Sequence, residues 1–408
     1  MKVLFLTMAG ISNVSSRGIY TDLLRTFRDE GHEVVVMSPI QRRENQKTFV
    51  KKEDNVTIVR VRTLNVEKAS VLEKGIGQLL IEQQFLKAVK KFLKNDSFDL
   101  VLYSTPPITF SAVIKYVKKR DNAYAYLLLK DIFPQNAVDM GMIRNGSILH
   151  RFFKRKERKL YALSDTIGCM SPANKEFLTK HNPEIAEDKI EINPNTIVPI
   201  VQAPQKDESV LEKYNLPIDK KIFVYGGNLG VPQGLDFLLD VIEQSSFDTV
   251  HFLIVGSGTQ YLKLKAWFSR KKPSNATLFS ALPKEDYDRL LGSCDVGLIF
   301  LHPNFSIPNF PSRLLSYLEM KMPVIAATDE NTDIGSYIEN YRCGFWVKSG
   351  DIDSFMAKTR KLLSANDAEF EKYRENARQL LFDNFTIEKS YNSIMLHMVN
   401  HSSHKKRK

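Results

Sequence analysis

The chain has 408 residues, a formal net charge of +11 and 43% hydrophobic residues. At about 150 residues per domain, this length predicts two large domains or three small ones, and the hydrophobic content excludes a disordered chain. The positive charge favours an acidic partner such as nucleic acid, a phosphate-bearing ligand or an anionic membrane. Three cysteines (Cys169, Cys294 and Cys343) lie far apart without Cys-x-x-Cys spacing, which excludes a zinc ribbon and favours a reducing compartment.

The sequence lacks the features of a membrane-spanning or secreted chain. No stretch approaches ~18 uninterrupted apolar residues, the length that spans a bilayer. The first apolar run, Val3–Thr7, fits a buried strand better than a signal peptide. We therefore expect a cytoplasmic protein that meets the inner face of the cell membrane only from its surface.

The first half of the chain alternates short apolar runs with segments of helical spacing. The expected elements are strand Val3–Thr7, helix Gly18–Glu30, strands Val34–Met37 and Val56–Val61, helix Leu79–Leu93, strand Leu100–Tyr103, helix Phe110–Val117 and strand Ala123–Leu129. Continuous apolar strands separated by helices predict a parallel sheet covered on both faces.

The alternation breaks at Asn193–Ile200 and at the polar stretch Gln202–Ser209, and then it begins again. The expected elements are strand Ile222–Tyr225, helix Gly234–Gln244, strand Val250–Val255, helix Tyr261–Ser269, strand Thr277–Ser280, helix Lys284–Gly292, strand Asp295–Phe300, helix Pro311–Met320 and strand Val324–Ala327. We predict an α/β fold of two doubly wound Rossmann-like domains, joined near residues 195–205, that face each other across a cleft.

Three glycine-rich turns follow predicted strands, at Met8–Gly18, Tyr225–Gly230 and Val255–Gly258. Small residues in such turns let backbone N–H groups approach an anion at a helix N-terminus. The sequence has neither a G-x-G-x-x-G motif nor a P-loop, which disfavours a dinucleotide or Walker-type site. Tight strand-to-helix geometry alone would also explain each turn.

A fourth candidate site lies in the segment Ser306–Tyr317. Pro311 suits a first helical turn, the Ser312 hydroxyl can satisfy exposed amides, and Arg313 places a forked cation beside the helix start. This arrangement predicts a diphosphate site, and its alternative is an ordinary helix start with a surface arginine.

Four motifs occur in order in the second half of the chain: Gly226–Asp236, Phe252–Gly258, Leu282–Gly297 and Pro311–Ala326. Together they resemble the C-terminal half of family-4 retaining glycosyltransferases, especially the branch that builds bacterial capsular and O-antigen polysaccharides. The N-terminal half is similar to the same family through Lys2–Thr7, Gly31–Val36 and Lys130–Pro134.

The resemblance implies a GT-B fold, with an acceptor-side domain (1–197) and a nucleotide-sugar-binding domain (198–384). It also implies a C-terminal helix (385–408) that packs back toward the first domain and ends in a basic tail. The implied substrates are a UDP-sugar, with an N-acetylated hexose, and a polyprenyl-diphosphate-linked glycan.

The resemblance also assigns roles to individual residues. The glycine turn near the donor matches Gly226, Gly227 and Asn228, and the turn beside the nucleotide matches Gly256 and Gly258. The contacts to the base match Leu282, Pro283 and Lys284, and the diphosphate-binding helix start matches Ser312 and Arg313. A polar residue that faces the donor sugar matches Asp131.

The sequence departs from the family at its acidic and basic motifs. The Glu-x7-Glu pair falls at Pro308 and Ser316, so Asn309 and Ser316 are the available substitutes. The phosphate-binding Arg and Lys are replaced by Asn228 and Gln233. Arg313 is therefore the main cation expected at the phosphates. Because a departing nucleoside diphosphate needs mainly electrostatic stabilisation, we expect no cofactor and no metal.

Basic residues cluster in the first half of the chain, in three groups: six between Arg151 and Lys159, then Lys87, Lys90, Lys91 and Lys94, and then Lys115, Lys118, Lys119 and Arg120. Such surfaces suit an anionic leaflet, at about 1 kcal/mol per Lys or Arg near the surface. Solvated helix faces are the alternative. No nucleic-acid-binding motif accompanies the charge, so we do not expect nucleic acid as the partner.

Three functions are compatible with these observations. The leading hypothesis is a glycosyltransferase. The second is a UDP-N-acetylhexosamine epimerase on the same fold, although no acidic and basic cluster for it is evident. The third, suggested by the missing glutamates, is a non-catalytic subunit of a glycan-assembly complex.

Overall fold

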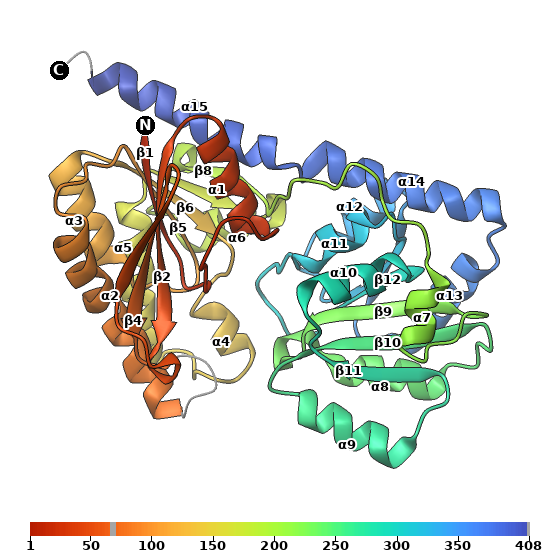
Figure 1. The fold of residues 1–408 in the computed structure, drawn as a ribbon. Coiled ribbons are helices and arrows are strands. Elements are labelled where there is room, and N and C mark those ends of the chain that lie inside the picture. The colour runs from red at the N-terminus through yellow and green to blue at the C-terminus, as the bar shows by residue number, and fades with distance from the viewer. Residues whose placement is uncertain (66–70, 406–408) are drawn as a thin grey trace. The chain divides into compact units, whose positions relative to one another are not determined.

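The computed structural model describes the backbone of residues 1–65 and 71–405. It divides into two compact units (Figure 1), unit 1 from Met1–Val198 together with the segment from Ile387 onward, and unit 2 from Pro199–Thr386. The limits between the units differ by one and two residues from the predicted limits at 197/198 and 384/385. Residues 406–408 of the predicted basic tail lie outside the described residues.

Unit 1 is built on an eight-stranded sheet in the order β3-β4-β2-β1-β5-β6-β7-β8. Its strands are β1 Lys2–Leu6, β2 Glu33–Gln41, β3 Phe49–Glu53, β4 Val56–Thr63, β5 Leu100–Ser104, β6 Tyr124–Leu129, β7 Thr166–Cys169 and β8 Ile190–Ile192. All neighbouring pairs are parallel except β3 and β4. The long runs of buried apolar residues in these strands agree with a sheet that is covered on both faces.

Helices cover both faces of this sheet. They are α1 Ile19–Asp29, α2 Val71–Phe92, α3 Ser111–Asp121, α4 Gln135–Asp139, α5 Ile148–Leu163, α6 Pro172–His181 and α15 Ile387–Lys405, with short 3₁₀ turns at Arg42–Glu44 and Glu187–Lys189. Helices α1 and α15 pack together on one face, where Phe27 and Ile394 join Phe5 in one core. Helices α2, α3 and α5 contact one another on the other side (Figure 1).

Unit 2 repeats this architecture with a fully parallel six-stranded sheet in the order β11-β10-β9-β12-β13-β14. Its strands are β9 Lys221–Asn228, β10 Val250–Ser257, β11 Ala276–Ser280, β12 Val296–Phe300, β13 Val324–Thr328 and β14 Gly344–Lys348. Its helices are α7 Glu208–Lys213, α8 Leu235–Gln244, α9 Tyr261–Lys271, α10 Lys284–Gly292, α11 Arg313–Glu319, α12 Ile334–Asn340, α13 Ile352–Leu363 and α14 Asp367–Asn384, with a 3₁₀ turn at Val231–Gln233. The α/β fold with two doubly wound sheets is thus confirmed.

Several predicted elements have different limits in the structure. Helix α2 begins at Val71 rather than Leu79, and β2 runs on through Pro39 because that residue pairs in register with Val61 of β4. The antiparallel strand β3 was not predicted, since its sequence, FVKKE, is mostly exposed and charged. Helix α11 begins at Arg313 instead of Pro311.

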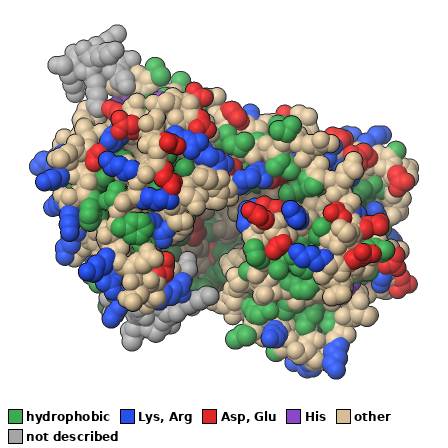
Figure 2. Space-filling model, in the orientation of Figure 1, with side chains coloured by type: hydrophobic (Ala, Val, Ile, Leu, Met, Phe, Trp, Pro, Cys, Tyr) green, Lys and Arg blue, Asp and Glu red, His purple; other side chains and the backbone are tan. Residues whose placement is uncertain are grey.

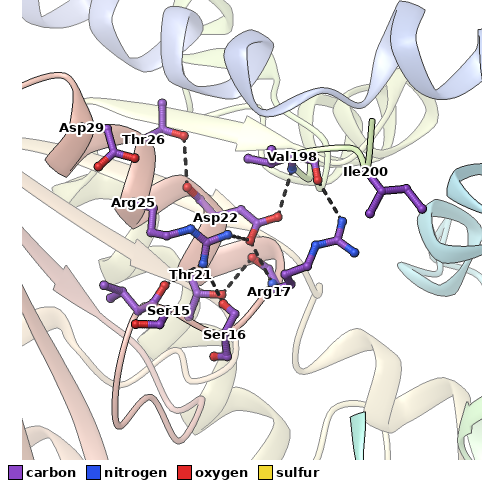
Figure 3. Close-up of polar contacts among 12 residues, drawn as sticks. Ser15, Ser16, Arg17, Thr21, Asp22, Arg25, Thr26, Asp29, Val198 and Ile200 are labelled. Carbon is purple, nitrogen blue, oxygen red and sulfur yellow. Dashed lines mark hydrogen bonds and ion pairs between the residues drawn. The ribbon is translucent and has the colours of Figure 1, made fainter. Parts of the chain in front are cut away.

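The chain leaves unit 1 after Val198 and returns to it at Ile387. These two points lie next to each other, since the Ile387 amide donates to the Ile197 carbonyl at 2.9 Å. Asp22 of α1, fully buried, fixes the first of these points (Figure 3). Its carboxylate accepts from the amides of Gly18 (3.0 Å) and Val198 (2.9 Å) and pairs with Arg25. One carboxylate therefore connects the loop after β1 to the start of the linker.

Lys and Arg side chains line the side of unit 1 that carries α2 and α3, as Figure 2 shows. Many of these charges have partners within the unit. Lys118 pairs with Asp165 at 2.7 Å, and Arg120 donates to the carboxylate of Asp121 and to the carbonyls of Leu93 and Asp96. Within the described residues, none of the helices has both the length and the apolar character needed to cross a membrane.

Candidate functional site

The strand order of unit 2 reverses between β9 and β12, since β10 and β11 extend the sheet on one side and β13 and β14 on the other. Ligands of open α/β sheets bind beyond the carboxyl ends of the strands at such a reversal. The chain after β9 and the chain before α11 lie at this edge. It therefore holds two of the predicted motifs, the turn at Gly226–Asn228 and the helix start at Ser312–Arg313.

Three of the predicted glycines are required by close packing. A Cβ on Gly226 would come within 1.8 Å of the Tyr287 hydroxyl, one on Gly256 within 1.9 Å of the Gly227 carbonyl oxygen, and one on Gly258 within 2.4 Å of the Leu229 backbone. Gly226 and Gly256 are also buried. These glycines let β9, β10 and α10 approach one another closely.

Gly227 is the exposed member of the turn and has a φ of +119°, which other residues rarely adopt. A Cβ at this position would lie 3.9 Å from the Arg313 guanidinium carbon. Asn228 is exposed as well. The predicted turn thus presents accessible backbone beside the predicted cation.

Arg313, the first residue of α11, is held by its neighbours in one orientation. Its guanidinium lies 4.2 Å from the centre of the Tyr225 ring, and its Nη2 donates to Gln233 Oε1 at 2.6 Å. Its Nη1 is buried and has no hydrogen-bond partner among the described residues. A buried donor on a cation is costly to leave unpaired, so this atom can donate a hydrogen bond to an anionic ligand without losing an existing contact.

Tyr225 and Tyr317 are neighbours of Arg313, and we call these three residues and Gln233 the Arg313 cluster. The Tyr317 hydroxyl accepts from the Gly226 amide at 3.1 Å and donates to the Leu298 carbonyl at 3.0 Å. Burial raises the pKa of Tyr317 to about 12, so it is a neutral hydroxyl at physiological pH. Although burial lowers the pKa of Arg313, the Tyr225 and Tyr317 hydroxyls raise it by more, and the guanidinium stays charged.

The expected capping role of Ser312 is wrong. Its side chain makes no capping hydrogen bond and is exposed, because its backbone is already helical (φ −65°, ψ −17°) rather than extended. An N-cap side chain reaches the following amides from an extended backbone.

The two substitutes for the missing glutamates differ in their surroundings. Asn309 is partly buried, and its backbone carbonyl accepts from the Thr332 hydroxyl at 2.5 Å. Its side-chain Nδ2 is buried without a partner among the described residues. Ser316 lies one turn into α11 and is also partly buried. Asn309 is thus the second residue at this edge with an unused buried donor.

The predicted base-contacting residues lie at the start of α10. This helix follows β11, which is separated from β9 by β10 in the sheet. Leu282 is partly buried, whereas Pro283 and Lys284 are exposed. The Lys284 ammonium already pairs with Asp288 at 2.5 Å. The same helix carries Tyr287, whose hydroxyl packs on Gly226. Helix α10 therefore links the predicted base-contacting residues to the glycine turn at the end of β9.

In unit 1, Asp131 follows β6 at the carboxyl edge of the sheet. Its Oδ2 accepts from Asn136 Nδ2 at 2.6 Å, and its backbone carbonyl accepts from the Thr105 hydroxyl at 2.9 Å. Burial raises the pKa of Asp131 to about 6. Asp131 is a loop residue that also presents a titratable carboxylate at this edge.

Lys130, the neighbour of Asp131, was not predicted to contribute. Its Nζ donates to the Asn193 carbonyl at 3.1 Å, and burial lowers its pKa to about 7. The Lys130-Asp131 dipeptide therefore holds two groups that titrate near neutral pH. Among the described residues, no three His, Cys, Asp or Glu side chains come together in a way that could hold a metal ion.

The residues that sequence reasoning missed, Tyr225, Tyr287 and Tyr317, all serve the Arg313 cluster. Each lies within or beside a motif that was singled out, but a tyrosine in a predicted strand or helix carries no signal of its own. Gln233 was expected only to replace the phosphate-binding lysine of the family that the sequence resembles. In the structure it orients Arg313.

Comparisons with known proteins agree with this architecture. Residues 206–380 match the family model "Glycosyl transferases group 1". The chain is 23% identical over 284 residues to "Probable glycosyltransferase WbjE" of Pseudomonas aeruginosa, covering 68% of this chain and 69% of the relative. It is 24% identical over 162 residues to "Putative colanic acid biosynthesis glycosyl transferase WcaI" of Escherichia coli K12, covering 38% and 39%.

Solved structures also resemble nearly the whole chain, among them the following two. Sucrose-phosphate synthase from Thermosynechococcus elongatus aligns with a TM-score of 0.76 at 14% identity, over 98% of this chain and 99% of that one. The structure "Trehalose-6-phosphate from E. coli bound with UDP-2-fluoro glucose" aligns with a TM-score of 0.73 at 12% identity, over 97% of this chain and 98% of that one. The chain therefore has the GT-B fold, and residues 206–380, which lie in unit 2, match the glycosyl transferases group 1 model.

Proposed function

We propose that this protein transfers a sugar from a UDP-sugar to a lipid-diphosphate-linked glycan, with retention of configuration, in the synthesis of a bacterial surface polysaccharide. The proposed sugar is an N-acetylated hexose. In this proposal unit 2 binds the donor and unit 1 binds the acceptor.

The observation that carries the proposal is the Arg313 cluster. Cleavage of a sugar–diphosphate bond leaves negative charge on the nucleoside diphosphate, and fixed donors aimed at that charge are the main catalytic requirement. Arg313 is fixed by Tyr225 and Gln233 and keeps Nη1 free of any described partner. We infer that Nη1 binds the departing diphosphate next to the backbone of Gly227 and Asn228.

Because this cation is part of the protein, we propose that the reaction needs no metal. Asn309 Nδ2 is a further donor at the same edge and would contact the donor sugar. In unit 1, Asp131 would orient the acceptor hydroxyl. At pH 7 the carboxylate is mostly ionised, since its pKa is about 6.

The comparisons support the nucleotide and the pathway class. One structural neighbour is bound with UDP-2-fluoro glucose, and one relative is named for colanic acid biosynthesis. The family match is to transferases and does not favour the epimerase or the non-catalytic subunit. The N-acetylated sugar, the lipid carrier and retention rest on the resemblance given in the sequence analysis.

A thermal-shift screen tests donor binding first. UDP and UDP-N-acetylhexosamines should raise the melting temperature with EDTA present, whereas ADP and GDP should not. Arg313→Ala should remove most of the shift. The matched control is Arg270→Ala, which removes an exposed arginine at the end of α9. No shift with any nucleotide sugar would contradict the proposal.

Turnover tests the reaction itself. Donor incubated alone should yield no epimer, and donor with a lipid-diphosphate acceptor should yield a glycoside whose anomeric configuration, read by NMR, matches the donor. An epimer from donor alone, or an inverted product, would overturn the corresponding part of the proposal.

A further inference from the structure

Helix α5, Ile148–Leu163, has one face in the core of unit 1 and an opposite face in solvent. Its buried residues are Phe153, Glu157, Leu160 and Tyr161. At 3.6 residues per turn, the side of the helix opposite these four carries Ile148, Arg151, Phe152, Arg155 and Lys159. All five are exposed. The solvent face of α5 thus combines large apolar side chains with cations.

The apolar side chains gather at the N-terminal end of α5. Ile148 is 81% exposed, Leu149 51% and Phe152 36%, and Met142 in the preceding loop is 64% exposed. Single exposed apolar residues are common, but several within two helical turns mark an interaction surface. We call these four residues the apolar tip of α5.

Three of the cations that follow the apolar tip lack acidic partners. Among the described residues, no carboxylate lies within ion-pair distance of Arg151, Arg155 or Lys159. The other three cations of the helix are paired, Lys154 with Glu157, Lys156 with Glu82 and Arg158 with Glu184. On α3, two of the four basic residues, Lys118 and Arg120, are engaged within the unit. Three unpaired positive charges behind an apolar tip are complementary to an anionic surface with an apolar interior.

The apolar tip lies at the same edge of the sheet as Asp131. The chain leaves β6, passes Asp131 and α4, and then enters α5 from this edge. The Phe133 ring contacts the Phe153 ring in the first turns of α5, with centres 4.9 Å apart. A partner bound at the apolar tip would therefore lie on the acceptor-binding side of unit 1.

We propose that the solvent face of α5 docks on an anionic lipid bilayer, with the apolar tip inserted among the acyl chains and Arg151, Arg155 and Lys159 at the headgroups. This inference deepens the proposed function and rests on it for the lipid-linked acceptor. Interfacial helices bind through buried apolar area plus attraction to anionic lipids. A second copy of this chain is disfavoured as the occupant, since it would bring the same cations against this surface.

Vesicle flotation of the full chain tests the proposal. Wild type should float with phosphatidylcholine vesicles that contain phosphatidylglycerol, but not with phosphatidylcholine alone, and added salt should weaken binding. The charge variant Arg151→Ala/Arg155→Ala/Lys159→Ala and the tip variant Ile148→Ser/Leu149→Ser/Phe152→Ser should each lower the partition coefficient at least tenfold.

Matched controls separate this surface from general charge and apolarity. Lys87→Ala/Lys91→Ala/Lys94→Ala removes three exposed charges from the region of α2, and Val201→Ser/Ile218→Ser/Leu262→Ser removes three exposed apolar side chains from unit 2. Both controls should bind vesicles within twofold of wild type. Phe152→Trp should show a blue-shifted emission on addition of anionic vesicles, which reports insertion.

Three results would overturn the proposal: no binding of wild type to anionic vesicles, an equal loss of binding in the α2 control, or self-association in solution that the tip variant abolishes. The UDP-induced thermal shift is measured on the same proteins. The tip variant should keep the full shift, because its residues lie outside unit 2. A wild type that binds vesicles but shows no shift with any nucleotide sugar would instead count against the proposed donor site.

Discussion

The two sheets end in similar edges that are built from different chemistry. In unit 2 the edge at β9 and β12 is made of close-packed glycines, neutral tyrosines and one permanently charged arginine. In unit 1 the edge after β6 presents Lys130 and Asp131, with pKa values of about 7 and about 6. The first edge has a charge that pH does not change, and the second has charges that change near neutral pH.

This difference indicates which unit is suited to binding the diphosphate and which to binding the acceptor. A departing diphosphate is an anion at all physiological pH values, so a fixed cation with an unused donor serves it best. An acceptor hydroxyl needs orientation and a group that can take part in proton transfer, for which a pKa near neutrality is suitable. The predictions below test this division, beginning with the largest expected effect.

Arg313→Ala should lower kcat/KM by about 10²–10³-fold, the loss typical of removing one donor from a charge-stabilising site. Arg313→Lys should recover only part, because a lysine cannot keep both the Gln233 contact and a second, forked donor. Steady-state kinetics with a saturating acceptor measure the effect. Equal activity of all three proteins would remove the proposed role of unit 2.

Gly256→Ala should cost about 3 kcal/mol of folding stability, since its Cβ would lie 1.9 Å from the Gly227 carbonyl oxygen. Gly10→Ala is the control, because no atom of the described part of the chain lies within 4 Å of the added Cβ. Urea unfolding measures both. A Gly256 variant as stable as the control would mean that close packing does not maintain the β9–β10 edge.

Asp22→Ala should cost about 2 kcal/mol, because it leaves the Gly18 and Val198 amides without their acceptor and removes the partner of Arg25. It should also speed proteolysis near residue 198. The control is Asp29→Ala on the same helix, whose side chain is exposed and, among the described residues, pairs with Arg28. Equal cleavage rates in both variants would contradict a linker anchored by Asp22.

Asp131→Asn should have the smallest effect, and one that depends on pH. Burial raises the pKa of Asp131 to about 6 in the folded protein, above the unfolded value of about 4. The folded state therefore binds the proton more tightly. This stabilises the folded protein fully below pH ~4 and is lost as the pH rises through 6. Wild type should therefore lose about 1–2 kcal/mol relative to the variant between pH 4 and pH 7.5. Chemical unfolding at several pH values measures this, and a difference that does not vary with pH would refute it.

Much of the fold followed from the sequence because hydrophobic periodicity is local. Helix α10 has the limits predicted for it, and α8 begins one residue later than predicted. Strand β3 escaped prediction because its pairing with β4, rather than its own exposed residues, makes it a strand. Its sequence alone carries too little apolar character to identify it.

The candidate site was predictable only where a motif is local. Gly226, Gly227 and Arg313 were singled out by glycine spacing and by a helix start. The contacts that orient Arg313 join positions 225, 233 and 313, and no local pattern links a tyrosine and a glutamine to an arginine at least 80 residues further on. The same holds for Lys130, whose lowered pKa arises from burial in the folded unit.

The most direct test of the donor site is a crystal structure of the protein with UDP. The account predicts that the diphosphate lies within hydrogen-bond distance of Arg313 Nη1 and of the backbone at Gly227–Asn228. A diphosphate bound elsewhere, with Arg313 still turned onto Tyr225 and Gln233 alone, would contradict it.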